Sequence, residues 1–250
     1  ILLPTSSGTG SEVTGLCVIH DTASHAKIPV YRSANLAIVD PMLTVSAPPA
    51  VTAASAFDAM SHALEAYTSK CHTEKVDTLA WQAIQLIAKN ILIAYVDGNN
   101  ITARENLAFA SNIAGIAFNE VSVHIGHAIA HEFGLQFHLS HGVACALTLT
   151  TVLHDIFSID SNRGIAVAQL FGYDPSTHAQ QPEEYLQDKI HNLLRDTGIQ
   201  SLRARGITLE QALGCATGAI NNNGFLDASP IPVTQEHMEN AIRFLYESYC

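Results

Sequence analysis

Histidine is concentrated in one stretch of the sequence, residues 123–142, which holds five of the thirteen histidines. His127 and His131 are four positions apart, so a helix here places both imidazoles on one face, one turn from each other. His141 follows ten residues later, next to Gly142. Imidazoles gathered in this way are candidate metal ligands, and the alternative is a set of buried, hydrogen-bonded histidines in an apolar helix.

A second pair has the same spacing upstream, where Asp58 and His62 are also four residues apart. Two helices that each offer such a face, together with a loop histidine, can surround one divalent ion. Three imidazoles and one carboxylate suit Fe, Zn, Ni or Co better than Mg or Ca, which prefer oxygen ligands. The two pairs together favour a metal site over packed histidines.

Composition limits the class of protein. Charged residues make up 14% of the chain, against a typical share of about 25%, and the net charge is −11. This acidic balance argues against nucleic-acid binding, which needs Lys and Arg to meet phosphates. No uninterrupted apolar run reaches the roughly eighteen residues of a membrane span. With five scattered cysteines and no C-x-x-C pair, we expect reduced thiols and a cytoplasmic location.

The first residues predict a strand followed by a ligand-binding loop. The opening Ile1-Leu-Leu-Pro4 has the character of the end of a buried strand, and we expect the chain to begin inside a domain. The next segment, Thr5-Ser-Ser-Gly-Thr-Gly-Ser-Glu12, is small, hydroxylic and glycine-rich, so its backbone and hydroxyls can approach phosphate or ribose oxygens. It is neither a Walker loop nor G-x-G-x-x-G, and a plain connector is the alternative.

Secondary-structure patterns divide the chain at about residue 46. Three β-prone runs come first, at Leu16–His20, Lys27–Tyr31 and 36–40. After Pro48-Pro49 nearly every segment has helical periodicity, with a candidate N-cap at Thr234. We expect helices over 50–69, 73–97, 102–120, the histidine stretch, 143–157, 161–171, 182–196, 208–220 and 234–249.

The motifs occur in the order seen in a known family. The chain carries P4-T-S-S-G-T-G-S-E-V-T14, D40-P, D58-A-M-S-H-A-L-E-A-Y67, H127-A-I-A-H131 and H138-L-S-H-G142. In these motifs it resembles the iron-containing, or group III, alcohol dehydrogenases over nearly its whole length. The resemblance implies the dehydroquinate synthase-like architecture of that family, which is mainly α. Residues 1–46 would be the last strands of an α/β NAD(P)-binding domain, and 47–250 an all-helical metal-binding catalytic domain.

The resemblance also implies roles for individual residues. The implied metal ligands are Asp58, His62, His127 and His141, and His131 would lie near the metal and move a proton or face the substrate. The implied cofactor contacts are Thr5, Ser6, Ser7, Gly8, Thr9, Lys27 and Leu43. Glu65 is either a partner that orients a ligand histidine or an ordinary carboxylate on the face of a helix.

The implied activity is metal-dependent, NAD(P)-linked alcohol dehydrogenation or aldehyde reduction. Hydride would pass between NAD or NADP and a small primary alcohol or aldehyde held at Fe(II) or Zn(II). The resemblance also implies a homo-oligomer, a dimer or larger. We expect neither nucleic acid nor a membrane as a partner.

Two other functions stay open. An all-helical metal-dependent phosphohydrolase would use His154-Asp155 as its central pair, although this leaves Asp58 and His62 without a role. The other is a metal-binding fragment without activity. The family's G-G-G-S-x-x-D phosphate loop is absent from this sequence, and we expect it to precede Ile1. The isolated 250-residue chain is therefore expected to bind NAD(P) weakly or not at all.

Overall fold

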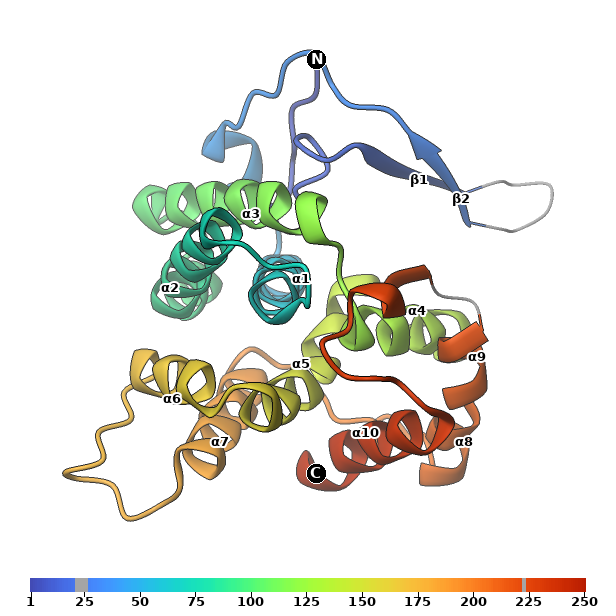
Figure 1. Ribbon diagram of the computed structural model, residues 1–250. Coiled ribbons are helices and arrows are strands. Elements are labelled where there is room, and N and C mark those ends of the chain that lie inside the picture. The colour runs from blue at the N-terminus through green and yellow to red at the C-terminus, as the bar shows by residue number, and fades with distance from the viewer. Residues whose placement is uncertain (21–26, 222–223) are drawn as a thin grey trace.

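Strand structure is confined to the start of the chain in the computed structural model, which describes residues 1–20, 27–221 and 224–250. β1 (Leu16–His20) and β2 (Lys27–Tyr31) form an antiparallel pair in which Leu16 lies opposite Tyr31. Both strands were predicted. They lie to the right of α3 (Ile101–Val121) in Figure 1.

The predicted third strand, 36–40, is wrong. Only Ala37 pairs, in a single parallel bridge to Leu2. The extended run then stops because the Asp40 carboxylate accepts a hydrogen bond from the backbone of Met42 and caps the short 3-10 helix η1, Pro41–Thr44. The opening residues 1–3, predicted as the end of a buried strand, have exposed side chains in this structure.

Helices build the rest of the chain, as the sequence predicts. Beside α3 they are α1 (Pro49–Thr68), α2 (Glu74–Val96), α4 (Ile125–Phe137), α5 (His141–Ile159), α6 (Ser161–Leu170), α7 (Pro182–Asp196), α8 (Leu209–Gly214), α9 (Ala216–Asn221) and α10 (Gln235–Ser248). A second 3-10 helix, η2 (Gly224–Ala228), lies between α9 and α10. The predicted helix over 208–220 is broken at Cys215 into α8 and α9.

Threonine and asparagine side chains start several of these helices. Thr73 Oγ1 accepts a hydrogen bond from Val76 N, and Asn100 Oδ1 accepts one from Ala103 N. The predicted cap at Thr234 is confirmed, because its hydroxyl accepts from His237 N at 3.1 Å. Each cap satisfies a backbone N–H that the first helical turn leaves without a partner.

The core is built around α1 and α5. α1 packs against α2, α3 and α5, and α5 also packs against α4, α6, α7 and α10 (Figure 1). Along α1 nearly every residue after the first turn is buried, and alanines recur at 53, 56, 59, 63 and 66. A helix that is apolar on all sides belongs in a protein interior, and its small side chains let the neighbouring helices come close.

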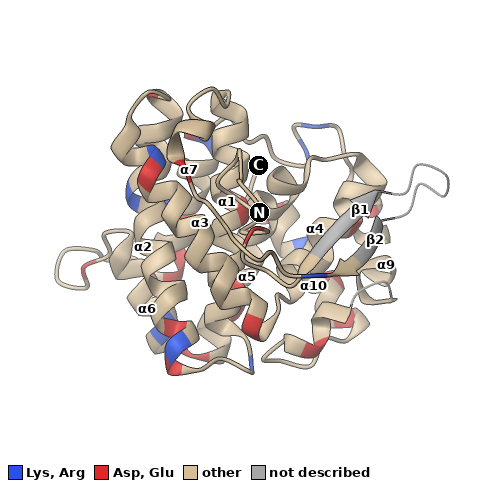
Figure 2. Cartoon of the chain, turned by 90° about the horizontal axis from the view of Figure 1, so that it is seen from above, with Lys and Arg blue, Asp and Glu red and all other residues tan. Residues whose placement is uncertain are grey.

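Two helices are long and apolar enough to cross a membrane by length and composition alone, α2 and α5. Neither helix contains an uninterrupted apolar run of eighteen residues. Of the apolar window in α5, 67% is buried inside this chain, and 39% of that in α2. The α5 window is mostly buried, as in a core helix, and one or two such helices are weak evidence for a membrane. Lys and Arg are few and lie at separate places, with Asp and Glu near them (Figure 2).

The start of α5 touches the backbone of α1, which makes Gly142 sensitive to substitution. A Cβ at Gly142 would lie 2.2 Å from the carbonyl oxygen of Ala54. We expect Gly142→Ala to lower the free energy of unfolding by about 1–3 kcal/mol, because one helix must move away from the other. Thermal and denaturant unfolding measure this change.

Gly134→Ala is the matched control. A Cβ at Gly134, inside α4, would meet only the Leu139 carbonyl oxygen at 3.5 Å, an ordinary contact. This substitution should be neutral, or stabilising by up to about 1 kcal/mol through helix propensity. Equal destabilisation by both substitutions would contradict the contact between α1 and α5.

Candidate metal centre

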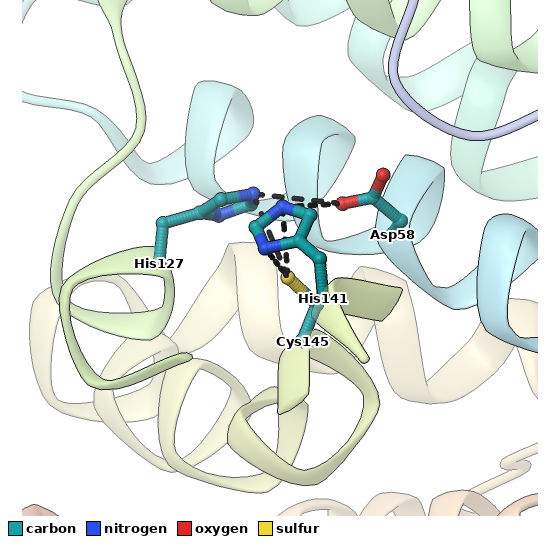
Figure 3. A group of neighbouring side chains, drawn as sticks. All are labelled: Asp58, His127, His141 and Cys145. Atoms are coloured by element: carbon teal, nitrogen blue, oxygen red, sulfur yellow. Dashed lines mark hydrogen bonds and ion pairs between the residues drawn. The ribbon is translucent and has the colours of Figure 1, made fainter. Parts of the chain in front are cut away.

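Three helices bring a carboxylate, two imidazoles and a thiol together. Asp58 extends from α1, His127 from α4, and His141 and Cys145 from α5 (Figure 3). One donor atom from each of the four lies within 4.8 Å of the others. Asp58 Oδ1 is 3.3 Å from His141 Nε2 and 3.7 Å from His127 Nε2. Among the described residues this is the one such group.

A tight turn makes α4 and α5 face each other across this group. α4 ends at Phe137, its C-cap His138 has a left-handed backbone with φ of 54°, and α5 begins at His141. His141 was expected in a loop, but it is the first residue of α5. The close approach of Gly142 to α1 then sets His141 next to Asp58.

Glu65 fixes both the start of α4 and the orientation of His127. Its carboxylate accepts from the backbone N–H of His124 at 2.5 Å and of His127 at 3.1 Å, while Oε1 lies 2.6 Å from His127 Nδ1. A carboxylate at a helix N-terminus also meets the positive end of the helix dipole. With Nδ1 as the donor to Glu65, Nε2 faces Asp58 with its lone pair available. Of the two alternatives for Glu65, this contact favours a partner that orients the His127 ring over an ordinary carboxylate on the face of a helix.

Gly126 explains how Glu65 reaches that position. A Cβ at Gly126 would lie 2.7 Å from Glu65 Oε1 and 2.7 Å from Val152 Cγ2. Glu65 is fully buried, so its carboxylate depends on these hydrogen bonds in place of water. The small residue at the start of α4 makes space for the carboxylate that caps the helix.

In this group, burial and the neighbouring side chains shift the pKa values in opposite directions. Burial raises the pKa of Asp58, but His62, His127 and His141 outweigh it and hold the pKa well below its usual value. The neighbouring Cys145, together with Asp58 and against burial, raises the pKa of His141 to about 10.

The second carboxylate behaves in the same way. Burial raises the pKa of Glu65, yet His127 and His124 bring it down to about 2. Burial also lowers the pKa of His127, but Cys145, Glu65 and Asp58 move it well above its usual value. The centre of the group therefore attracts positive charge, whether from a proton or from a metal ion.

The other two predicted histidines flank the group. His62 Nδ1 is 3.9 Å from Asp58 Oδ1, and its ring is stacked between Phe118 and His127 at 4.1 and 4.6 Å. Burial lowers the pKa of His62 to about 4 despite the Asp58 carboxylate. His131 is half-buried, and its ring centroid lies 5.2 Å from that of His141 and 6.3 Å from that of His127. Their roles as ligand and proton carrier stay predictions.

The predicted cofactor segment packs on α1 one turn before Asp58. A Cβ at Gly8 would lie 3.0 Å from Ser55 Cα, and Ser6 and Ser7 line a small hollow with Thr52. The roles predicted for Thr5, Ser6, Ser7, Gly8 and Thr9 are not tested by this placement. Of the other two predicted contacts, Leu43 is exposed in η1, and Lys27 begins β2 with a side chain outside the described part of the chain.

The continuation of this segment rests on α3. A Cβ at Gly10, which has φ of +58°, would lie 2.6 Å from Gly115 Cα. Asn112 donates a hydrogen bond to Glu12 at 2.9 Å, and Gly15 N donates to Asn119 at 2.7 Å. The loop is therefore held between α1 and α3 by close backbone contacts and two polar anchors.

Cys145 is the member of the group that sequence analysis missed. It lies four residues after His141, the spacing that singled out the other pairs. The relation was hidden because His141 was placed in a loop and helix 143–157 was expected to start after it.

The pair considered for a phosphohydrolase does not form a metal group among the described residues. His154 Nδ1 is 2.5 Å from Glu183 Oε1, and the His154 ring stacks on Phe244. Asp155 faces His237 at 3.4 Å. These are two separate pairs, each made with a different helix.

The donors fit a divalent transition metal or zinc. Asp58 Oδ1 and His62 Nδ1 are buried without a hydrogen bond of normal geometry in the described structure. Buried polar atoms usually have a partner, and an ion between them would supply it. Nitrogen, oxygen and sulfur donors at these separations suit Fe or Zn and do not suit Mg or Ca.

Comparisons with known proteins agree with this arrangement. A model of the Fe-containing alcohol dehydrogenase family, C-terminal, matches residues 52–246. Long-chain-alcohol dehydrogenase 1 of Geobacillus thermodenitrificans is 37% identical over 252 residues, covering 99% of this chain and 62% of that protein. The 1-propanol dehydrogenase PduQ of Citrobacter freundii is 45% identical over 157 residues, covering 62% of this chain and 42% of that protein.

A solved structure matches equally well. The crystal structure of a 1,3-propanediol oxidoreductase superimposes with a TM-score of 0.89 and 33% identity, covering 98% of this chain and 65% of its own. The present chain thus spans less than two thirds of each of these three relatives.

The contacts of Glu65 predict the effect of Glu65→Gln, which puts an NH₂ donor against the N–H groups of α4. We expect the affinity for Zn²⁺ to fall about 10–100-fold, as when a partner behind a ligating histidine is lost. We also expect a loss of unfolding free energy of about 1–3 kcal/mol from the unsatisfied buried groups. Equilibrium dialysis and denaturant unfolding measure these two effects.

Glu247→Gln removes the same charge from an exposed position in the last turn of α10 and serves as the control. It should change neither quantity. Unaltered Zn²⁺ affinity in Glu65→Gln would show that the carboxylate does not act on His127.

Proposed function

Because the chain belongs to the Fe-containing alcohol dehydrogenase family, we propose that it forms the metal-holding part of an NAD(P)-linked alcohol dehydrogenase or aldehyde reductase. The observation that carries this proposal is the convergence of Asp58, His127 and His141 from three helices. The glycine-rich segment beside α1, packed one turn before Asp58, supports it further. The relatives are named for alcohols and a diol, which favours small or linear primary alcohols and their aldehydes as substrates.

The residues of the proposed site would hold the metal ion, supply negative charge and orient a ligand. When bound, Fe(II) or Zn(II) supplies Lewis-acid polarisation of an alcohol or aldehyde oxygen. Asp58, His62, His127 and His141 would hold the ion. Asp58 brings negative charge to the site, and Glu65 keeps the His127 ring in the tautomer that leaves Nε2 free to bind.

The side of the group at His141 is where a substrate would enter. The His141 side chain is 34% exposed, whereas those of Asp58 and His127 are almost fully covered. His131 lies at this side, with Phe225 of η2 against its ring at 5.2 Å. We propose that His131 takes the alcohol proton or returns it to the product, next to an aromatic wall that excludes water.

The cofactor would lie beside α1 at the glycine-rich segment, where Gly8 packs on Ser55, next to the Ala54 that the start of α5 contacts. Serine and threonine hydroxyls and the backbone N–H groups of residues 5–9 would bind its phosphate and ribose oxygens. Bringing nicotinamide and alcohol together in this way supplies the orientation that hydride transfer needs. The choice between NAD and NADP is part of the test below.

We also propose that the protein is cytoplasmic, with reduced cysteines, and that it forms a homo-oligomer. Four of the five cysteines are free thiols in the structure, namely Cys71, Cys145, Cys215 and Cys250, which suits a reducing compartment. Exposed apolar side chains on α2 support an oligomer, since Leu92, Ile93 and Val96 would be covered there.

The proposal is tested by elemental analysis and turnover of the complete natural protein that contains this chain, purified without oxygen. We expect about one Fe or Zn per chain in the wild type and none in Asp58→Ala or His141→Ala. Oxidation of primary alcohols with NAD or NADP should disappear in the same two variants. Retained metal and activity in both variants would remove these residues from the site, and phosphatase activity without NAD(P)-linked turnover would favour the phosphohydrolase.

His131→Gln separates proton transfer from metal binding. We expect the metal content to stay at the wild-type level and the turnover number to fall about 100- to 10,000-fold, the usual contribution of a general acid or base. His138→Asn is the control, because His138 is exposed and asparagine tolerates its left-handed backbone. Loss of metal in His131→Gln would instead make His131 a ligand.

A further inference from the structure

The glycine-rich segment turns alternate residues toward the helices on which it packs. Its residues at the even positions from 8 to 14 are buried, whereas Thr9 and Ser11 are exposed. The two exposed hydroxyls lie side by side, with Thr9 Oγ1 at 3.0 Å from Ser11 Oγ. Which side chains face outward therefore depends on how the segment is aligned with the helices.

Two contacts with α3 set this alignment. A Cβ at Gly10 would lie 2.6 Å from Gly115 Cα, and Asn112 Nδ2 donates a hydrogen bond to Glu12 Oε1 at 2.9 Å. Asn112 and Gly115 are three positions apart, so they lie on one face of α3. The contact between the glycines only requires small residues. The hydrogen bond has a preferred distance and direction, so it specifies one alignment of the segment.

Glu12 is a buried carboxylate, and its partner differs from those of other buried acids in this chain. Asp58, Glu65 and Asp155 each face a histidine. Glu12, which is 4% exposed, has the side-chain amide of Asn112 instead. A buried carboxylate that loses its donor is costly, so the segment is stable where Asn112 reaches Glu12.

Glu12 also lies next to the predicted cofactor contacts. It lines one small hollow together with Ser6 and Ser7, and the same two serines line the hollow with Thr52 of α1. Because the Glu12 carboxylate is covered, it is not open to a ligand. Its position suits a residue that acts through the segment instead of touching the cofactor.

We propose that Glu12 and Asn112 are positioning residues for the nicotinamide cofactor. Their hydrogen bond holds residues 5–12 in the alignment that presents the hydroxyls of Thr9 and Ser11, which adds Ser11 to the residues that face the cofactor. The inference rests on the proposed function, because it concerns the affinity for NAD or NADP. It leaves the set of metal ligands unchanged.

Exchanging the two side-chain groups tests the bond in the complete natural protein that contains this chain. Asn112→Asp places a second carboxylate against Glu12. We expect the dissociation constant for NAD or NADP to rise about tenfold or more, the effect of leaving a buried group without a partner. Glu12→Gln combined with Asn112→Asp restores the bond with the donor now on residue 12. The constant should then return to within about threefold of the wild-type value, the range of near-neutral substitutions. Isothermal titration calorimetry measures these constants.

Two further measurements separate positioning from a general loss of structure. Backbone hydrogen exchange of residues 5–12 should become faster in Asn112→Asp and return to the wild-type rate in the double variant. The affinity for Zn²⁺ should stay at the wild-type value in both, because the metal ligands lie on α1, α4 and α5. Asn112→Ala removes the donor without adding a charge, and it should change cofactor affinity and exchange in the same direction by a smaller amount.

Asn106→Asp is the matched control. Asn106 is also a half-buried asparagine of α3, but its Nδ2 donates to Asn90 Oδ1 of α2 at 3.1 Å and not to the glycine-rich segment. The control loses one hydrogen bond of α3, as Asn112→Asp does. It should leave the cofactor affinity and the exchange of residues 5–12 unchanged.

The outcomes separate the inference from the proposed function. Cofactor affinity that is unchanged in Asn112→Asp, or that falls equally in Asn106→Asp, would overturn the inference and leave the proposed function intact. A double variant that binds as weakly as Asn112→Asp would also overturn it, because the loss would not come from the bond. A wild-type protein that holds metal but binds neither NAD nor NADP would overturn the proposed function together with the inference.

Discussion

The burial of the Asp58 carboxylate is the constraint on which the rest of the structure depends. An ionised carboxylate at this depth costs several kcal/mol unless opposite charge stands next to it. Two imidazoles from other helices supply that charge, His127 from α4 and His141 from α5. In this group the pKa values of the carboxylates Asp58 and Glu65 are lowered and those of the imidazoles His127 and His141 are raised, so groups of opposite charge face each other. A divalent ion carries the same charge as the two protons on these imidazoles. The helices can therefore keep one arrangement with either occupant.

One turn of α1 positions both the glycine-rich segment and the start of α5. Gly8 approaches Ser55 and Gly142 approaches Ala54, so the glycine-rich segment and the start of α5 rest on neighbouring residues of the same turn. Asp58 follows on the next turn. Larger side chains at the two glycines would push these segments apart. Small residues thus link the proposed cofactor side to the ligands through backbone contact, which is stiffer than contact through flexible side chains.

Local patterns predicted most of the fold because helices depend on residues close in sequence. Apolar periodicity gave the helices, and Thr234 gave an N-cap that the structure confirms. The prediction of a strand over 36–40 was wrong because a strand forms only where a neighbouring strand pairs with it. Here the pairing is a single bridge between Ala37 and Leu2. Pairwise spacing found His127 and Asp58, but it could not show that Cys145 lies among them. That relation requires knowing where α5 begins, which the contact of Gly142 with α1 determines.

The same limit explains the start of α4. Helices usually begin with a side chain that accepts a hydrogen bond from the first turn, as Thr234 does in α10. The N-cap of α4 is His124, which makes no such bond; its ring instead contacts Thr68 of α1 at 2.8 Å. The missing cap comes from Glu65, also on α1. The first turn of α4 therefore becomes stable only when α1 is docked. Because Glu65 also fixes the His127 ring, the event that completes the helix is the one that orients its ligand.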